Sequence, residues 1–387
     1  MPPASRTLLV LSAVATLGAR AASAAPVPPT DLFAFPGTNP SPASAVSAGL
    51  ALADRWLGDE PYDHAAGALR PAVSLSPIVL RTSRQDLRAH NNEYTETSAF
   101  FDAAGGYAAF SPGSHRWGVA VYAAQPVLRR EEIDFTHGEA GAPTAPFVVV
   151  TQTESREARA GLAFATRVRG LELGLAPEWT THHDRFVLDD QSAGGPTAGV
   201  TSWDFSGSGV GFLASARATL PASVPGRVRV GASARFVPEL AMDGTIIATP
   251  DGPEDPLSAT RESAWEGGVS IEASPSPVCR LILGGGGRTA TGWTGFAARS
   301  GASVQMALAA EYHDAGVPWR ARIGIGRDSN PGTPESGASV FGLGLGWVDH
   351  RLSYDVGVLH RGLQRSDAPA SSDDRVTGSV TYRFGGE

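Results

Sequence analysis

Apolar and polar residues alternate along most of this chain with a period of two. In the stretch 375–384, the even positions are apolar or glycine and the odd positions are polar: Val376, Gly378, Val380, Tyr382 and Phe384 against Arg375, Thr377, Ser379, Thr381 and Arg383. The same alternation recurs in 302–312, 338–347 and 350–364. Because successive side chains of a strand point to opposite faces, the pattern predicts β-strands that each have one apolar face.

The pattern predicts fourteen strands after residue 70, and many of them are long. The predicted strands are 72–82, 98–111, 115–132, 155–168, 170–187, 203–219, 227–247, 259–273, 278–294, 302–312, 318–328, 338–347, 350–364 and 374–385. Strands of soluble sheets are usually about 5–6 residues long, whereas strands that span a membrane need about 9–11. Aromatic residues lie near the predicted strand ends, as a girdle at the lipid–water interface requires: Trp117, Phe164, Trp179, Trp203, Tyr312, Trp319, Trp347 and Tyr382.

The connections between the predicted strands alternate between long and short. The long ones are 83–97, 133–154, 188–202, 248–258, 295–301, 329–337 and 365–373, and the short ones are 112–114, 169, 220–226, 274–277, 313–317 and 348–349. Short periplasmic turns and long outer loops are typical of outer-membrane barrels, and a soluble β-sandwich, the alternative, has no reason to alternate in this way. The sequence therefore predicts an all-β fold, a transmembrane antiparallel up-and-down β-barrel of about fourteen strands.

The N-terminus has the pattern of a cleavable export signal. Arg6 precedes a short apolar run at 8–17, and Ala22, Ser23 and Ala24 form a small-residue cleavage site. The run is too short to cross a bilayer as a helix, which needs about 20 apolar residues. We therefore expect a signal peptide at 1–24, an N-terminal lead and luminal hatch at 25–70, and the barrel at 71–387 in the outer membrane.

Composition and motifs exclude several classes of function. The net charge of -8 argues against a nucleic-acid partner, and the single cysteine, Cys279, allows no intrachain disulfide and no cysteine-based metal site. No cofactor motif is present, and no Ser-His-acid spacing stands out, so we expect no cofactor and no enzyme activity. His182 and His183 precede Asp184, but adjacent residues of a strand point to opposite faces, so we expect no metal site there.

The segment 44–70 is a poor strand but a suitable plug. It contains the small-residue run Ala48, Gly49, Ala53 and Asp54, which predicts a helical turn followed by a loop. Irregular backbone is tolerated at membrane depth where it contacts protein and water inside a lumen. We therefore interpret this segment as a hatch inside the barrel.

This small-residue run, followed by Asp63 and His64, resembles the N-terminal region of the FadL/TodX-type outer-membrane transporters of hydrophobic compounds. Where this chain has Asp63 and His64, members of that family often carry the triplet Asn-Pro-Ala. The resemblance implies a fourteen-stranded barrel plugged by an N-terminal hatch. It also implies a fatty-acid-like ligand, which passes the hatch and leaves sideways through a kinked third strand. Proline inside a strand loses a ladder hydrogen bond, so Pro126 gives the predicted strand 115–132 a physical reason for such a kink.

Candidate ligand-binding or gating residues are Pro126, Arg129, Arg130 and Arg159. Arg159 faces the lumen if Leu162, in the same strand, faces lipid. An inward arginine can bind a carboxylate through paired hydrogen bonds, or it can pair with a luminal acid.

Several expected luminal positions are glycine: Gly324, Gly326, Gly342, Gly344 and Gly346. They leave room for a plug, or they ease the curvature of the barrel. Gly284 to Gly287 interrupt the alternation in the strand 278–294, which indicates a bulge or a close backbone approach.

Three functions stay open at this point: a transporter of hydrophobic molecules, a general diffusion porin for polar solutes, and a non-transporting barrel that serves secretion or assembly. The expected partners are a fatty-acid-like ligand, outer-membrane lipid and the barrel assembly machinery, which reads the closing strand near Phe384.

Overall fold

The computed structural model describes residues 43–87, 92–98, 102–113, 115–137, 147–190, 199–220, 227–247, 252–294, 298–300, 302–314, 316–329, 337–364 and 371–384. The predicted signal peptide and the lead up to residue 42 lie outside these ranges. The two short helices are α3 (Ala45–Gly49) and the 3-10 helix η1 (Ala65–Leu69). The strand elements are β1 (Ala72–Leu87), β2 (Asn92–Ser98), β3 (Asp102–Phe110), β4 (Trp117–His137), β5 (Phe147–Val168), β6 (Leu171–Asp190), β7 (Gly199–Leu220), β8 (Arg227–Val237), β9 (Leu240–Ile247), β10 (Asp255–Arg261), β11 (Ala264–Ser276), β12 (Cys279–Arg288), β13 (Thr291–Thr294), β14 (Ala298–Ser300), β15 (Ser303–His313), β16 (Trp319–Ser329), β17 (Gly337–Asp349), β18 (Leu352–Gln364) and β19 (Ser371–Arg383).

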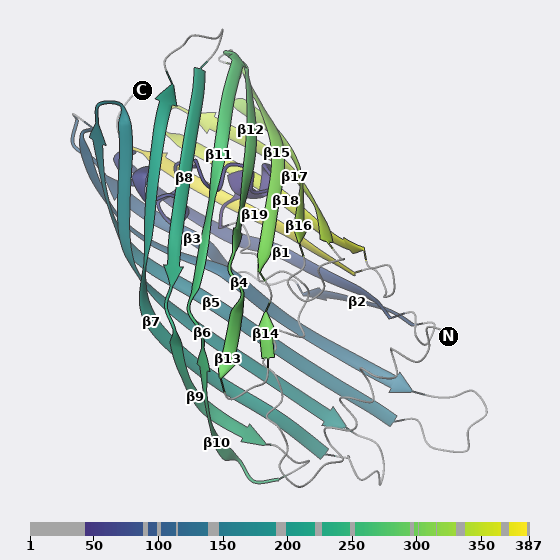
Figure 1. Cartoon of the computed structure of the whole chain (residues 1–387). Coiled ribbons are helices and arrows are strands. Elements are labelled where there is room, and N and C mark those ends of the chain that lie inside the picture. The colour runs from purple at the N-terminus through teal and green to yellow at the C-terminus, as the bar shows by residue number, and fades with distance from the viewer. Residues whose placement is uncertain are drawn as a thin grey trace.

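The strands form one closed antiparallel barrel (Figure 1). The first strand pairs with the last, from Ala72 opposite Arg383 to Gln85 opposite Ser371, so this pairing closes the wall. Five pairs of consecutive elements (β2 with β3, β8 with β9, β10 with β11, β12 with β13, β14 with β15) each make one barrel strand with a short interruption. Within the described residues the barrel therefore has fourteen strands, which confirms the predicted number.

The outer faces of the strands are apolar and the inner faces are polar, the reverse of a soluble protein. On β17, Leu343 and Leu345 are exposed, while on β19 the inward Arg375, Thr377 and Ser379 are buried. This arrangement places hydrocarbon against lipid and charge in the lumen, as in transmembrane barrels. It excludes the soluble sandwich. Among the described residues no helix is long and apolar enough to serve as a membrane span.

One predicted girdle residue is misplaced. Trp203 was expected at the lipid interface, but it is buried inside the barrel, whereas Trp117, Trp179 and Trp347 face outward and are about half exposed. Trp203 lies on the part of β7 that continues beyond the apolar band. There the inward face is also apolar, so the alternation in the sequence does not indicate which face is inside.

Several predicted long loops are shorter than expected, because the strands continue beyond the apolar band. The expected loop 83–97 is mostly a β1–β2 hairpin, paired from Arg81–Ser98 to Leu87–Asn92. Likewise, β4 and β5 stay paired as far as His137 and Phe147, inside the expected loop 133–154. The β1–β2 hairpin is almost entirely polar, so it carries no apolar alternation and hydropathy does not reveal it. The β4–β5 extension does contain apolar residues, among them Ile133, Phe135 and Val149, inside the expected loop. Both backbone ladders form nonetheless.

The barrel has two distinct ends. At the short-turn end, strands are joined by tight turns such as 169–170 and 350–351. Toward the opposite, long-loop end, three neighbouring strands are interrupted at 238–239, 262–263 and 289–290, and the wall continues as β9, β10 and β13 (Figure 1). This second part of the wall extends the lumen past the apolar band.

Candidate functional site

The hatch segment, residues 43–70, lies inside the barrel (Figure 1). Of the predicted hatch residues, Ala48, Gly49, Ala53, Asp54 and His64 are buried. The predicted Asp63 has a side chain that is 12% exposed. The helix α3 begins after Ser44, whose hydroxyl accepts a hydrogen bond from the Ser47 amide at 3.2 Å, an N-cap that satisfies one free end of the helix. The hatch segment thus fills the lumen as irregular backbone surrounded by protein.

Luminal glycines make room for the hatch. A Cβ on Gly49 would lie 2.8 Å from the Cα of Gly344, and a Cβ on Gly342 would overlap the backbone of Ala48. On other strands, Gly324 lies against Leu50 and Gly284 against Ala53. Side chains at these wall positions would occupy the space of the hatch backbone.

Two of the luminal glycines do not contact the hatch. Gly346 lies under the side chains of Arg322 and Asp355, and Gly326 lies against the neighbouring strand at Ala307. Room for a plug is therefore the correct interpretation for Gly324, Gly342 and Gly344, but not for these two.

Wall side chains satisfy the hatch backbone. The Ser270 hydroxyl donates to the Ala53 carbonyl at 2.8 Å, and the Arg217 guanidinium donates to the Leu57 carbonyl at 2.9 Å. In the other direction, the hydroxyls of Ser215 and Ser379 accept from hatch amides at 2.9 Å each. Backbone groups without regular secondary structure need such partners when they are buried. The hatch is thus held by its main chain as well as by its side chains.

Charged side chains meet beside the hatch at mid-height in the lumen. We call them the luminal charge cluster: Glu157, Arg159, Glu178, Arg235, Arg261, Glu266 and Arg288. All seven are buried. Arg159, a predicted ligand-binding residue, faces the lumen as expected and donates to Glu157 and to Glu266, the latter at 2.7 and 3.0 Å. Arg235 donates to Glu178 at 2.8 Å, and Arg261 to Glu157 at 2.9 Å. Arg159 therefore already has carboxylate partners within the protein.

The hatch takes part in this cluster. Arg55 of the hatch lies 3.5 Å from Glu266 and 3.6 Å from Asp63, and Arg235 donates to the carbonyl of Tyr62. Glu266 thus faces four arginines, Arg159, Arg235 and Arg288 from the wall and one from the hatch. His64 adds no charge to the cluster, because burial lowers the pKa of its ring to about 4 and the ring is neutral at pH 7.

One arginine of the cluster differs from the rest. Arg288 is buried, yet none of its three nitrogens has a hydrogen-bond partner among the described residues. Its nearest carboxylate oxygens belong to Glu266, at 3.5 Å, and Glu157, at 3.9 Å. Beside it, both ring nitrogens of the buried His182 also lack a hydrogen bond. A buried polar atom without a partner costs about 1–3 kcal/mol, so these groups mark a place for atoms of a ligand or of water.

Apolar side chains line the lumen directly beyond this place, toward the long-loop end. The luminal apolar cluster consists of Trp203, Phe205, Leu240, Met242, Leu257, Ala259 and Trp293, all buried. The Trp293 ring lies 5.9 Å from the His182 ring and 5.7 Å from the Phe205 ring, centroid to centroid. Apolar surface and a guanidinium without hydrogen bonds are therefore adjacent inside one lumen.

The barrel wall is irregular at the predicted kink. The pairing of β4 with β5 shifts register between Ala124 and Val127, a bulge that contains Pro126. On the other side of β4, the ladder with β3 ends at the pair Gly105–Ala124. Arg129 and Arg130 follow in β4, and their side chains lie outside the described residues. Pro126 is therefore at an interruption of the wall, as expected for a residue that removes a ladder hydrogen bond.

The His182–His183 pair divides between the two faces of β6, as expected. The side chain of His182 is 1% exposed and points into the lumen, and that of His183 is 35% exposed and lies 2.9 Å from Asp204. The two rings therefore do not face one common ion.

Sequence reasoning missed most of the luminal charge cluster. Glu157, Glu266 and Arg288 lie on three different strands, and only closure of the barrel brings them together. A usable signal was present, because each is a charged residue at an inward position of its strand. Glu157 lies in the middle of its strand, and Glu266 and Arg288 lie beside glycine runs. Their mutual contact, however, depends on strand register across the lumen.

The pKa of Asp54 gives a testable pH dependence. Burial raises it from 3.8 to about 6, although the Ser47 hydroxyl donates to this carboxyl at 3.0 Å. Between about pH 4 and pH 6 the folded state keeps a proton that the unfolded chain has lost, so stability falls as the pH rises through this window. We expect Asp54→Asn to remove this fall and to stabilise the protein at pH 7 by roughly 2 kcal/mol. The free energy of unfolding at pH 4 and pH 7 measures it. The exposed Asp349→Asn is the control, and an equal pH dependence in wild type and Asp54→Asn would contradict the expectation.

Comparison with known proteins agrees with the fold. No protein-family model matches the chain, and no curated protein sequence matches it. Solved structures do. A FadL homologue of Pseudomonas aeruginosa has 13% identity and a TM-score of 0.60, with 89% of this chain and 99% of that chain covered. The toluene transporter TodX of Pseudomonas putida has 11% identity and a TM-score of 0.60, with coverage of 88% and 98%. The toluene transporter TbuX of Ralstonia pickettii has 12% identity and a TM-score of 0.57, with coverage of 90% and 100%.

Two of these structures are toluene transporters, and what all three share with this chain is the whole barrel rather than a segment of it. The closed fourteen-stranded wall, its outward apolar band and the match over nine tenths of the chain confirm the predicted outer-membrane barrel. The chain therefore has the fold of the FadL/TodX-type outer-membrane transporters of hydrophobic compounds.

Proposed function

We propose that this protein takes up hydrophobic small molecules that carry a carboxylate at one end, of the long-chain fatty-acid type. The molecule enters at the long-loop end and places its apolar part in the luminal apolar cluster. Its carboxylate lies at Arg288. The hatch closes the path below, and the molecule leaves sideways where β4 is interrupted at Pro126. The similarity to toluene transporters and to a FadL homologue supports the apolar part of this proposal.

The observation that carries the proposal is Arg288. The buried Arg288 guanidinium makes no hydrogen bond among the described residues, and a carboxylate is the group that accepts two parallel hydrogen bonds from a guanidinium. The aromatic rings of Trp293 and Phe205 lie on the side from which an apolar tail would extend. An amphipathic acid matches both halves of this site, whereas a hydrocarbon matches only one.

The sideways exit rests on the wall at β4. The bulge at 124–127 and the end of the β3–β4 ladder occur at the same height, so two neighbouring ladders of this wall are interrupted together. A hydrophobic molecule that leaves through the wall stays in lipid, while one that continues past the hatch must enter water. The hydrophobic effect therefore favours the sideways route.

A general diffusion porin is a poorer match. Such a channel needs a continuous water-filled path, and here residues 43–70 occupy the lumen between opposite walls, from Gly174 on β6 to Gly342 on β17. An assembly scaffold would have no use for a buried arginine whose hydrogen-bond donors are unsatisfied.

Uptake by protein reconstituted in lipid vesicles tests the proposal. We expect Arg288→Met to lower the affinity for a long-chain fatty acid about ten- to a hundredfold, as expected for the loss of a charged hydrogen bond, and to leave toluene uptake unchanged. Arg351→Met, at an exposed turn, is the matched control. Equal loss of both substrates, or none of either, would contradict a carboxylate at Arg288. Failure of the wild type to take up any hydrophobic substrate would overturn the transport function itself.

A further inference from the structure

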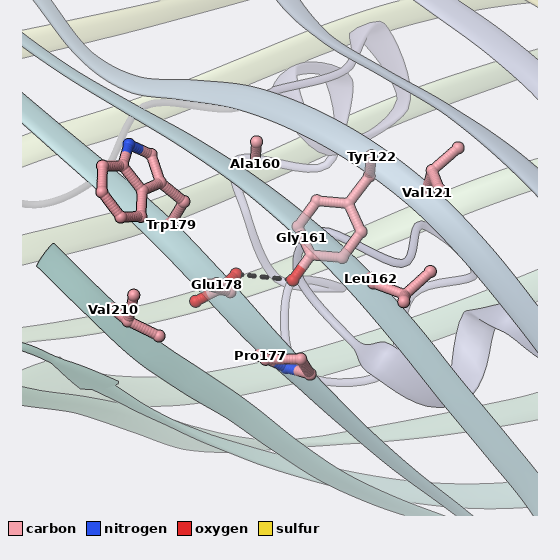
Figure 2. Close-up of a pocket in the computed structure, with 9 residues that line it drawn as sticks. All are labelled: Val121, Tyr122, Ala160, Gly161, Leu162, Pro177, Glu178, Trp179 and Val210. Atoms are coloured by element: carbon pink, nitrogen blue, oxygen red, sulfur yellow. Dashed lines mark hydrogen bonds between the residues drawn. The ribbon is translucent and has the colours of Figure 1, made fainter.

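The lipid-facing side of the wall has a hollow next to the bulge at 124–127. It has a volume of about 440 Å³ and lies over strands β4 to β7 (Figure 2). Its rim consists of the outward side chains of Val121, Leu162, Trp179 and Val210, each 40–62% exposed. Ala160 and Pro177, which are small or compact, lie between them. The hollow thus exists because short side chains are surrounded by large ones.

The backbone ladder between β5 and β6 is also interrupted at the hollow. The β5–β6 pairing runs as far as Gly161–Glu178 and resumes at Phe164–Leu175, and Pro177, which has no amide hydrogen, lies in the interval. At Gly161 a side chain would overlap the ring of Tyr122, which crosses the inner side of β5 (Figure 2). The Tyr122 ring and the Glu178 side chain, which lie on the inner side of the wall, therefore form the floor of the hollow.

In that floor, both oxygens of the Glu178 carboxylate accept hydrogen bonds. The Tyr122 hydroxyl donates to one Glu178 oxygen at 2.7 Å, and Arg235 donates to the other at 2.8 Å. Both Tyr122 and Glu178 are buried, so the surface that the hollow presents is almost entirely carbon. Among the described residues that line the hollow, no charged group is left to bind a polar ligand, so the occupant must be apolar.

The position of the hollow identifies the source of that occupant. Phe212, which pairs with Pro177, packs with the outward rings of Phe236 and Trp265, and the ring centroids are 5.2–5.7 Å apart. Such a belt of rings marks the membrane interface, here on the long-loop side. The hollow is continuous with the lipid-facing surface and opens toward lipid, while Tyr122 and Glu178 close it toward the lumen.

We propose that this hollow is a binding site for one acyl chain of an outer-leaflet lipid, which stays with the barrel as a resident lipid. An engineered apolar cavity of about 150 Å³ already holds a benzene ring, so the volume here accommodates a chain segment. The chain lies along the Trp179 ring and over Ala160, and it buries apolar atoms that would otherwise contact lipid loosely. This inference does not depend on the proposed transport function.

Fluorescence quenching by phosphatidylcholine with brominated acyl chains tests it on the detergent-purified protein. The contribution of Trp179 is the difference between wild type and Trp179→Phe. That of Trp347, which has the same 51% exposure on the far wall, is the control obtained from Trp347→Phe. We expect quenching of Trp179 to saturate near one lipid per barrel, and that of Trp347 to rise without saturation.

A filled hollow provides the second test. We expect Ala160→Phe to abolish the saturable quenching and to remove the lipid retained by the protein in native mass spectrometry. Ala310→Phe, an outward position on β15, should retain it. Trp179 quenching that follows Trp347, or lipid retention that survives Ala160→Phe, would overturn the site. Saturable quenching by bromobenzene but not by the lipid would also overturn it, because the occupant would then be an aromatic solute.

Discussion

Glu266→Gln lowers the free energy of unfolding of this barrel by about 3–5 kcal/mol, the range expected when one partner is removed from a buried ion pair. Glu266 is buried and accepts hydrogen bonds from Arg159 and Arg235 of the wall and lies 3.5 Å from Arg55 of the hatch. A neutral amide leaves these arginines with too little negative charge in a site where water does not screen them. Urea-dependent unfolding in lipid vesicles, followed by tryptophan fluorescence at pH 7, measures the loss.

The control for this substitution is Glu239→Gln, at an exposed position between β8 and β9. The chemical change is the same, but the side chain is in water, so its effect is expected within about 0.5 kcal/mol. If Glu266→Gln costs no more than Glu239→Gln, the luminal charge cluster does not hold the protein together as its geometry indicates. By contrast, Arg288→Met removes a cation that has no hydrogen-bond partner in the described residues, so it should cost far less stability than Glu266→Gln.

Gly284→Val displaces the hatch and opens the barrel to ions. A Cβ at Gly284 would overlap the Ala53 backbone and lie 3.0 Å from the Ser270 hydroxyl, the group that donates to the Ala53 carbonyl. The wall strand β12 is held by backbone ladders with β11 and β15, whereas the hatch is held to the wall by isolated hydrogen bonds. We therefore expect the hatch to move rather than the wall. Overpacking of this kind costs about 1–3 kcal/mol, which corresponds to roughly a ten- to hundredfold increase in the open fraction.

The neighbouring residue provides a matched control. At Gly285 a Cβ would point outward and meet only ordinary contacts, 3.8 Å from Gln305 and Met306. Single-channel conductance in planar bilayers compares the two variants with wild type and with a protein that lacks residues 25–70. We expect wild type and Gly285→Val to be closed, and Gly284→Val to open ten- to a hundredfold more often than wild type, with the truncated protein as the fully open reference. A closed Gly284→Val, or a wild type that already passes large currents, would show that residues 43–70 do not act as a plug.

The fold was largely predictable because the inward or outward direction of each side chain in a barrel wall depends only on its position along its own strand. One lipid-facing and one luminal side chain alternate along every strand, as in 338–347, and this requirement leaves a period-two pattern that does not depend on which strand is the neighbour. The segment inside the lumen gave a related signal, since small residues such as Ala48, Gly49 and Ala53 interrupt the strand pattern there. The polar extensions such as β2 were not predictable, because strands in water need no apolar face.

The candidate site was predictable only in part. That Arg159 faces the lumen followed from strand parity with Leu162, but its partners did not: Glu157 and Glu266 were not foreseen. Which charges meet across a lumen depends on the register of several strands and on closure of the barrel, and neither is encoded within one strand. Arg288 could not be singled out from other inward arginines, because the absence of a partner is a property of the whole packed interior.

The sequence by itself determined the strands, their number, the outward apolar face and the presence of a small-residue segment suited to a lumen, because each of these is imposed by neighbours along the chain and by the surrounding lipid. The tertiary structure alone decided that the hatch lies against Gly284 and Gly342, that Arg288 is left without a hydrogen bond beside Trp293, and that a hollow opens over Gly161. These features arise where residues distant in sequence meet, and barrel closure sets those distances.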